Sequence, residues 1–238
     1  MRYLLTSLLL AFVVLSSGCD PDGYSCNSEG CYSDDSSPQY QTLEDCLSVC
    51  DEITPTPESC GDLVSHEGYD YSTVLIGEQC WFSENCRYLP EVSPSSEGSE
   101  TEPYYYVYGY EGTDVAAAMS TSNYATYGVL YNWPAVMTEG ICPSGWHIPS
   151  DGEWQTMEIS LGMSESEAAQ TGWRGTDEGY QMKSSSGWNS GGNGSNSSGF
   201  TGLPGGFRYS GGFYYLGDDG YWWSASEAGS NSMFRFLD

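Results

Sequence analysis

The stretch Cys142-Pro-Ser-Gly-Trp-His-Ile-Pro-Ser-Asp-Gly-Glu-Trp154 holds the clearest local structural signal in the chain. Ser150 followed by Glu153 is a capping box, in which each side chain bonds the backbone N–H group of the other residue where a helix begins. Trp154 and Met157 follow at the spacing of one helix face. The stretch therefore predicts a helix that starts at Ser150 and packs an aromatic residue into a core.

Short strands are predicted on both sides of this helix. Two strands meet in a bend at Gly77, and later strands are divided by glycine-rich turns. Helical signals early and antiparallel hairpins late predict an α+β fold. The predicted strands run over Tyr71 to Ile76, Gln79 to Phe82, Tyr104 to Tyr110, Gly206 to Tyr209, Phe213 to Leu216, Tyr221 to Ser226 and Met233 to Leu237, and a helical turn runs over Val115 to Met119.

The first nineteen residues have the features of an export signal. Arg2 precedes an uncharged apolar run that is too short to span a bilayer comfortably. The run ends in Leu15-Ser-Ser-Gly-Cys19, which resembles the bacterial lipoprotein signal, although Ser16 stands where a bulky aliphatic residue is usual. We expect lipidation at Cys19 and a place in the cell envelope, on the outer membrane or cell surface. Ordinary secretory cleavage and a secreted protein are the alternative.

Cysteine usage agrees with export. If Cys19 carries lipid, eight of the nine cysteines remain, an even set that predicts disulfides in an exported chain. Metal binding is disfavoured because no CxxC pair occurs and His66 and His147 are the only histidines. The disulfide candidates are Cys26, Cys31, Cys46, Cys50, Cys60, Cys80, Cys86 and Cys142.

These cysteines divide the mature chain into two parts. Residues 20–50 hold four cysteines in a segment too small for a hydrophobic core, which predicts a disulfide-stapled module. Residues 51–59 alternate Pro and Thr and form an extended linker. Residues 60–238 are long enough for one domain with its own core.

Charge and aromatic content narrow the partners. The net charge of −27 excludes nucleic acid as a partner and leaves the lipid anchor as the only membrane contact. We expect the acidic surface to serve solubility, with calcium or a cationic partner as the alternative. The chain has 20 tyrosines and 8 tryptophans but only 6 lysines and arginines, which is an unusual balance. We expect some of these aromatic rings to contact sugar or protein.

Five motifs, in order, resemble the Fibrobacter succinogenes major paralogous domain, a family of envelope and secreted bacterial proteins. The resemblance covers Cys60 to the C-terminus and implies a C-type lectin-like architecture, but no established activity. It also implies a last strand with a cysteine beyond the equivalent of Asp238, which we expect to be missing here. Either the gene is shortened or Cys142 has changed partner, Cys86 being one choice. The motifs are Ile76 to Asn85, Tyr127 to Trp133, Cys142 to Trp154, Ser198 to Arg208 and Gly220 to Glu227.

Catalytic and metal motifs are not found. There is no nucleophile elbow, and His66-Glu67 is not continued into HExxH. His147 and Asp151 are the strongest candidates for a catalytic pair. We favour a structural role instead, in which His147 packs beside Trp146 and bonds to the backbone. Glu84 and Asn85 are expected in a core network, and Asp218-Asp219 in a turn. We expect no enzyme and no cofactor; a hydrolase with two facing carboxylates is the alternative.

A ligand face is predicted in the C-terminal third, where rings and amides mix in the way that suits stacking on sugars and bonding of hydroxyls. Trp222 and Trp223 are consecutive on a strand, so one is expected inward and the other outward. The expected partner is an extracellular glycan or, alternatively, an envelope or surface protein in an adhesion or scaffold role. The candidates are Trp188, Asn189, Asn193, Asn196, Tyr214, Tyr215, Trp222 and Trp223.

Overall fold

The computed structural model describes residues 60–228 and 231–238, with the backbones of Val13–Val14, Ser25–Asn27 and Gly30–Tyr32. The predicted lipidation site Cys19, the linker 51–59, and Cys46 and Cys50 lie outside the described residues. Of the four-cysteine module, β2 (Ser25–Asn27) and β3 (Gly30–Tyr32) pair antiparallel, with Cys26 opposite Cys31. β1 (Val13–Val14) pairs with β7 of the main domain.

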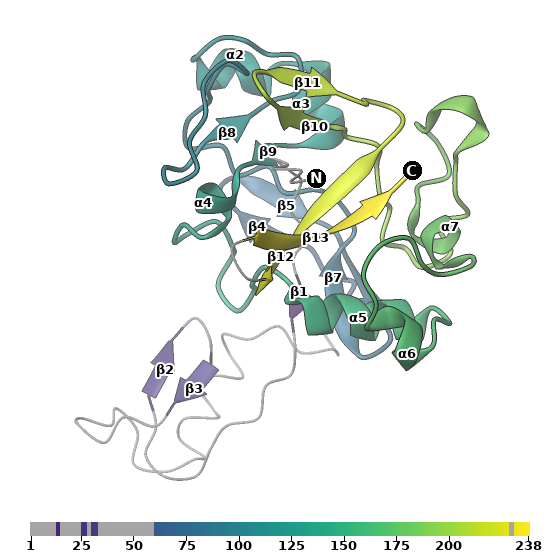
Figure 1. Cartoon of the computed structure of the whole chain (residues 1–238). Coiled ribbons are helices and arrows are strands. Elements are labelled where there is room, and N and C mark those ends of the chain that lie inside the picture. Colours follow the sequence, from purple (N-terminus) through teal and green to yellow (C-terminus); the bar gives the residue numbers. More distant parts are fainter. Residues whose placement is uncertain (1–12, 15–24, 28–29, 33–59, 229–230) are drawn as a thin grey trace.

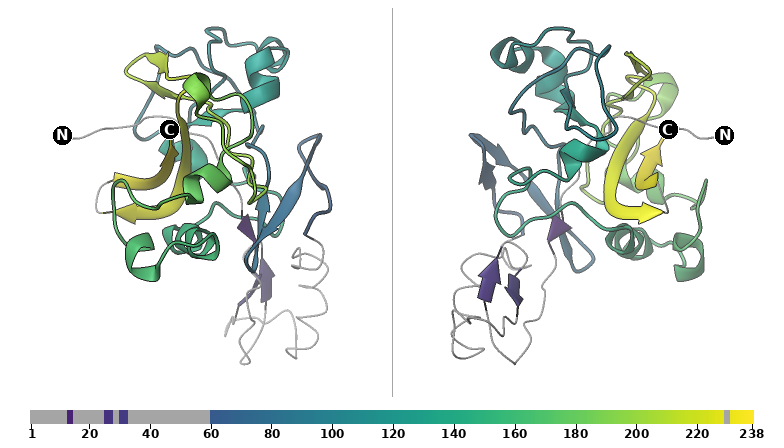
Figure 2. Two further views of the ribbon diagram at one scale, coloured as in Figure 1. Left: turned by 90° about the vertical axis from the view of Figure 1, so that its right-hand side faces the viewer. Right: turned by 60° about the vertical axis from the view of Figure 1, so that its left-hand side comes forward.

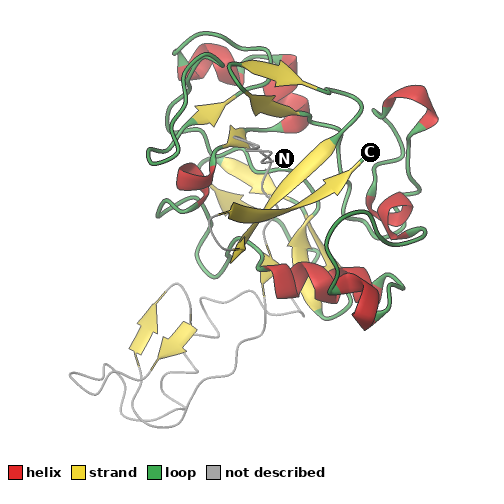
Figure 3. Cartoon of the chain, in the orientation of Figure 1, coloured by secondary structure: helices red, strands yellow, loops and turns green. Residues whose placement is uncertain are grey.

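The main domain is α+β, as predicted, with short antiparallel strand pairs and a few short helices (Figure 3). The strands are β4 (Val64–His66), β5 (Tyr69–Tyr71), β6 (Thr73–Ile76), β7 (Gln79–Phe82), β8 (Tyr105–Tyr106), β9 (Leu130–Tyr131), β10 (Phe207–Tyr209), β11 (Gly212–Tyr214), β12 (Gly220–Ala228) and β13 (Asn231–Leu237). The helices are α2 (Val115–Met119), α3 (Ser122–Tyr127), α4 (Trp133–Val136), α5 (Asp151–Ser160), α6 (Glu165–Ala168), α7 (Glu178–Met182) and the 3₁₀ turn η2 (Asn189–Gly191).

Glycine positions set the turns that the sequence predicted. β6 and β7 pair across the bend at Gly77, whose φ of 63° is in the left-handed region that favours glycine. The predicted strand from Tyr104 to Tyr110 is wrong beyond its first residues, because the chain turns at Gly109 and the Tyr110 N–H donates to the Val107 carbonyl. The tertiary turn therefore shortens this strand to β8.

The β12–β13 hairpin runs through the middle of the domain, with α5 across one end and the β10–β11 hairpin nearer the other (Figure 1). The hairpin bends strongly (Figure 2), and its register shifts between Trp223 and Glu227, the position of a β-bulge. Consecutive residues of β12 enter separate core clusters: Trp222 packs with Trp154, and Trp223 with Trp133. Both faces of this hairpin are therefore covered.

α5 begins with the predicted capping box. The Ser150 hydroxyl accepts from the Glu153 N–H, and the Glu153 carboxylate accepts from the Ser150 N–H. Trp154 and Met157 are fully buried, as their spacing predicted. At the same end, the Ala225 N–H donates to the Pro149 carbonyl, so the start of α5 is fastened to the bulge of β12.

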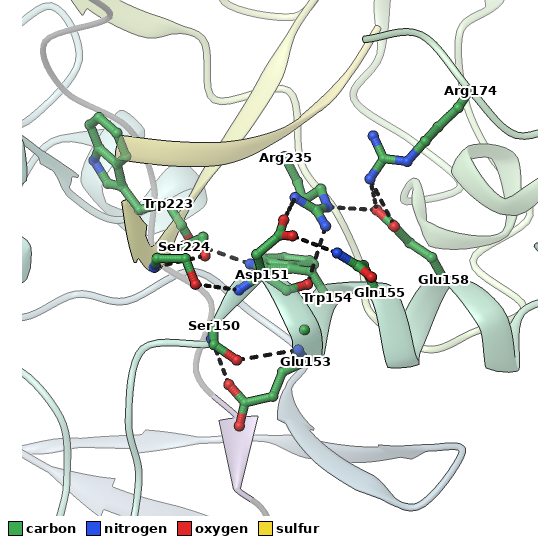
Figure 4. Close-up of polar contacts among 12 residues, drawn as sticks. Ser150, Asp151, Glu153, Trp154, Gln155, Glu158, Arg174, Trp223, Ser224 and Arg235 are labelled. Atoms are coloured by element: carbon green, nitrogen blue, oxygen red, sulfur yellow. Dashed lines mark hydrogen bonds and ion pairs between the residues drawn. The ribbon is translucent and has the colours of Figure 1, made fainter. Parts of the chain in front are cut away.

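Two arginines join α5 to the rest of the domain (Figure 4). Glu158 accepts from Arg174 through both carboxylate oxygens, at 2.9 and 2.8 Å, and from the Arg235 Nε at 2.6 Å. Arg235 also donates to Asp151 at 2.7 Å. The network is charge-balanced and mostly buried, so it ties β13 and the loop before α7 to one helix.

The other basic side chains of residues 60–238 are also engaged in the fold. Arg87 donates to the carbonyls of Tyr124 and Ala125, and Arg208 donates to those of Ser95 and Glu97. Lys183 is 9% exposed and Arg208 is 6% exposed. The described surface of the domain is therefore dominated by carboxylates. No helix among the described residues is long and apolar enough to cross a membrane.

Candidate functional site

A pocket of about 360 Å³ opens where the end of β13 meets the η2 loop and the loop between β11 and β12. It combines two aromatic side chains, an amide and three carboxylates. This is the mixture that binds hydroxyl-rich ligands, because rings contact apolar faces while amides and carboxylates bond hydroxyl groups. The lining residues are Trp188, Asn189, Ser190, Gly192, Tyr215, Asp218, Asp219 and Asp238.

Asn189 joins the two loops of the pocket. Its N–H donates to the Gly217 carbonyl at 2.7 Å, and its side-chain amide donates to Asp218 at 3.3 Å. Gly217 has a φ of 87°, and a Cβ at this position would lie 2.5 Å from the Asn189 amide nitrogen. Glycine is thus required both for the turn and for the close approach of Asn189.

Trp188 forms the inner wall of the pocket and is 5% exposed. Its Nε1 donates to the Ser184 hydroxyl and to the Gly202 carbonyl, which sets the ring orientation. Lys183 lies behind it, with Nζ 4.6 Å from the ring centroid and bonded to the backbone oxygen of Asp238 at 2.6 Å. Burial lowers the pKa of Lys183, and the charge of Asp238 opposes that shift.

Three aspartates give the pocket a negative potential. Burial raises the pKa of Asp219, the charges of Asp238 and Asp218 raise it further, and a hydrogen bond from the Tyr221 hydroxyl lowers it. That bond is 3.0 Å long. In the part of the chain that the structure describes, neither Asp218 nor Asp219 pairs with an arginine or lysine. The pocket therefore disfavours anionic ligands.

The predicted ligand face is only partly assembled in this pocket. Trp188, Asn189 and Tyr215 line it. Asn193 supports it, because its side-chain oxygen accepts from the Trp188 N–H at 3.0 Å. Asn196 instead bonds Thr201 within its own loop. Tyr214 is 42% exposed and does not line the pocket.

The prediction that one of Trp222 and Trp223 points outward is wrong. Their side chains do lie on opposite faces of β12, but the exposed fractions are only 1% and 4%. The Trp222 Nε1 donates to Asn85 at 3.0 Å, and the Trp223 Nε1 donates to the Tyr131 carbonyl at 2.8 Å. Alternation decides which face a residue takes, whereas the covering elements decide whether that face meets solvent.

The other candidate polar residues form hydrogen bonds within the fold. One of them, His147, has a different partner from the one predicted. Glu84 and Asn85 lie in hydrogen-bond networks with Tyr69 and Trp222, as predicted. His147 bonds neither Asp151 nor backbone; its Nε2 lies 2.6 Å from the Glu153 carboxylate, because the capping box places that carboxylate beside the helix entry. Burial by itself would raise the pKa of Glu153, but the bond and charge of His147 hold it below its usual value.

The cysteines of the domain show one disulfide. Cys60 and Cys80 are bonded, within the predicted group of the outer domain. Cys86 and Cys142 are free thiols, so their predicted disulfide is not formed in this structure. Burial raises the pKa of the Cys86 thiol to about 11, and the Tyr131 hydroxyl bonds its sulfur at 3.1 Å. Burial, followed by the nearby Cys86, also raises the pKa of Cys142. Neither thiol is an activated nucleophile.

Sequence reasoning missed the acids of the pocket and the lysine behind Trp188. Asp218 and Asp219 do lie in the predicted turn, but that turn also forms a pocket wall. The aromatic pair Tyr214-Tyr215, separated only by Leu216 from Gly217-Asp-Asp-Gly220, was the available signal. No local sequence signal marked Asp238 or Lys183, since strand pairing and a loop crossing bring these two residues to the pocket region. Among the described residues, no group of three or more His, Cys, Asp or Glu side chains is placed to hold a metal ion.

Comparison with known proteins identifies the domain. A sequence model of the Fibrobacter succinogenes major domain family matches residues 74–237, well over half of the chain. The chain therefore belongs to this family, as the five motifs predicted. Neither the curated proteins nor the solved structures contain a significant match.

Proposed function

We propose that this member of the Fibrobacter succinogenes major domain family is a cell-envelope lipoprotein whose outer domain binds a glycan and catalyses no reaction. The observation that carries the proposal is the pocket between η2 and the β11–β12 loop. It places the Trp188 ring, the Asn189 amide and the Asp218 carboxylate around one opening. Rings and hydrogen-bonding groups fixed by the fold are what sugar recognition requires.

The charge distribution supports a neutral ligand. The arginines of the domain are used within the fold, and Lys183 is bonded to the backbone oxygen of Asp238. Among the described residues, Asp218 and Asp219 of the pocket have no arginine or lysine partner. An anionic polysaccharide or nucleic acid would be repelled. A neutral glycan can accept and donate hydrogen bonds with carboxylates and amides without meeting a charge of the same sign.

The resemblance of Leu15-Ser-Ser-Gly-Cys19 to a lipoprotein signal supports the proposed envelope location. A lipid on Cys19, followed by the four-cysteine module and a Pro/Thr linker, would present the domain away from the membrane surface. Metabolic labelling with an alkyne fatty acid tests this: we expect label on the wild-type protein and none on Cys19→Ser. Label retained on Cys19→Ser would reject lipidation at this residue.

A glycan screen tests the binding function. The oxidised protein is applied to neutral and charged glycans with calcium and again with a chelator. We expect binding to neutral glycans that Asn189→Ala weakens about tenfold, since a hydrogen bond to a ligand and a loop contact are both lost. Tyr209→Ala, an exposed ring outside the pocket, is the control. Loss of binding with the chelator would add calcium as a ligand of the site.

A hydrolase is the second candidate, and one observation favours it. Asp219 has a raised pKa and shares the pocket with Asp218 and Asp238, the kind of environment that keeps one carboxyl protonated as a general acid. Release of reducing ends from a bound glycan, lost in Asp219→Asn, would establish catalysis and reject the non-catalytic proposal. A folded protein that binds no glycan would favour a protein-binding or scaffold role instead.

A further inference from the structure

Trp173 is the most exposed aromatic residue among the described parts of the domain, with 73% of its surface open to solvent. It lies in the loop between α6 and α7, outside the pocket lining. Exposing an indole ring to water is unfavourable, so a tryptophan that the fold holds in contact with solvent is a candidate for binding a ligand.

The Trp173 loop is held in place. The next residue, Arg174, donates two hydrogen bonds of 2.9 and 2.8 Å to the buried Glu158 of α5 (Figure 4). The Gly175 N–H donates to Glu167 at 2.9 Å. The Trp173 ring itself lies edge-on to Phe236, 4.8 Å between centroids. The ring is thus positioned in advance, which lowers the entropy cost of binding something to it.

A row of aromatic rings connects Trp173 to the pocket. Phe236 stacks on Tyr221 at 4.5 Å, Tyr221 meets Phe207 at 5.1 Å, and Phe207 stacks on Tyr215 at 5.7 Å. Tyr215 lines the pocket and is 57% exposed. The two exposed rings, Trp173 and Tyr215, therefore lie at opposite ends of one row. Neighbouring ring centroids in this row are 4.5 to 5.7 Å apart.

The pocket acids lie along the same face. Phe236 and Tyr221 are cross-strand partners on β13 and β12, so their side chains share one face of the hairpin. Asp219 is two residues before Tyr221 and bonds its hydroxyl, and Asp238 is two residues after Phe236. The pocket carboxylates Asp219 and Asp238 are therefore each close in the chain to a ring of the row that leads to Trp173.

We propose that Trp173 is a second subsite of the same binding surface, so that the ligand is a neutral glycan chain several sugars long rather than a single sugar. This inference rests on the proposed glycan-binding function. A chain of repeated units presents an apolar ring face to each exposed aromatic, and hydroxyl groups to the carboxylates of the pocket. A protein partner would instead need a contiguous apolar centre. Here Trp173 and Tyr215 are the exposed ends of a row whose middle rings, Tyr221 and Phe207, are buried.

The test compares ligand length. Titration calorimetry is run with the full chain, purified in detergent, against β-linked hexasaccharides and disaccharides of glucose, mannose and galactose. We expect Trp173→Ala to weaken hexasaccharide binding about tenfold and to leave disaccharide binding unchanged, because only the longer chain reaches the second ring. Trp173→Phe should restore most of the affinity. Tyr209→Ala is the matched exposed-ring control, and equal melting temperatures check that each variant is folded.

The outcomes separate the two proposals. If wild-type protein binds some of these glycans but Trp173→Ala binds both lengths as wild type does, the second subsite is rejected and the pocket remains. If Trp173→Ala weakens disaccharide and hexasaccharide equally, Trp173 belongs to the pocket's own site, and the chain-length inference is again rejected. If no glycan binds to the folded wild-type protein, the glycan function fails and the subsite with it.

Discussion

Two regions at the β12–β13 hairpin, the face packed on α5 and the pocket face at the end of β13, treat acidic residues in opposite ways. On the α5 face, Asp151 and Glu158 are paired with Arg235 and Arg174 in a buried, charge-balanced network. On the pocket face, Asp218 and Asp219 have no arginine partner. In this strongly acidic chain, a carboxylate by itself indicates nothing. The presence or absence of a cationic partner distinguishes the acids that stabilise the fold from those available to a ligand.

Removing a compensating cation should produce the largest effect. We expect Arg235→Met to reduce the free energy of unfolding by about 3–5 kcal/mol, because Glu158 and Asp151 would lose a buried partner. Urea unfolding measures the change. Arg174→Met is the matched control and should cost less, since its side chain is 15% exposed against 9% for Arg235. A loss below about 1 kcal/mol for Arg235→Met would show that the network does not hold the hairpin.

Neutralising an uncompensated acid should act in the other direction. We expect Asp219→Asn to raise the free energy of unfolding by less than about 1 kcal/mol at pH 7, since a partly exposed, desolvated charge is removed. Because its folded pKa is raised, wild-type stability should fall relative to the variant as pH rises from about 3.9, the unfolded value, through the folded pKa. Above that the difference should stay constant. Thermal unfolding of both proteins between pH 3 and pH 8 follows it, and a gap that closes with rising pH would contradict the assignment.

The smallest expected effect on stability is at Asp218. Its side chain is exposed and accepts one long hydrogen bond from Asn189. Asp218→Asn should change the free energy of unfolding by less than about 0.5 kcal/mol while weakening glycan binding. Urea unfolding and calorimetry on the same preparation compare the two effects. A large stability loss with unchanged binding would place Asp218 among the structural acids and remove the contrast between the faces.

Local signals predicted much of the secondary structure. The capping box at Ser150, the bend at Gly77 and the turns that separate β10, β11 and β12 involve residues close in the chain, and the structure contains each of them. The strand predicted from Tyr104 failed beyond its first residues, because the turn at Gly109 interrupts a run whose composition favours a strand throughout. Local backbone geometry can be predicted from the sequence where it requires one residue type. It cannot be predicted where several residue types are compatible with it.

The candidate site was less predictable for a different reason. Trp188, Asn189 and Tyr215 could be named from their residue types, but Trp222 and Trp223 have the same chemistry and are buried. His147 was expected to bond backbone and instead bonds Glu153. The burial of the two tryptophans depends on which elements cover the faces of β12, and no local pattern encodes that.

By itself, the sequence determined the α+β class, the family and the positions of the main turns, because these follow from motifs and from backbone preferences of neighbouring residues. Only the tertiary structure decided which rings are exposed and which acids are compensated. Lys183 and Asp238 meet behind Trp188 across more than fifty residues of chain. Such contacts arise from the packing of whole elements, and that packing makes one aspartate part of the framework and another part of a pocket.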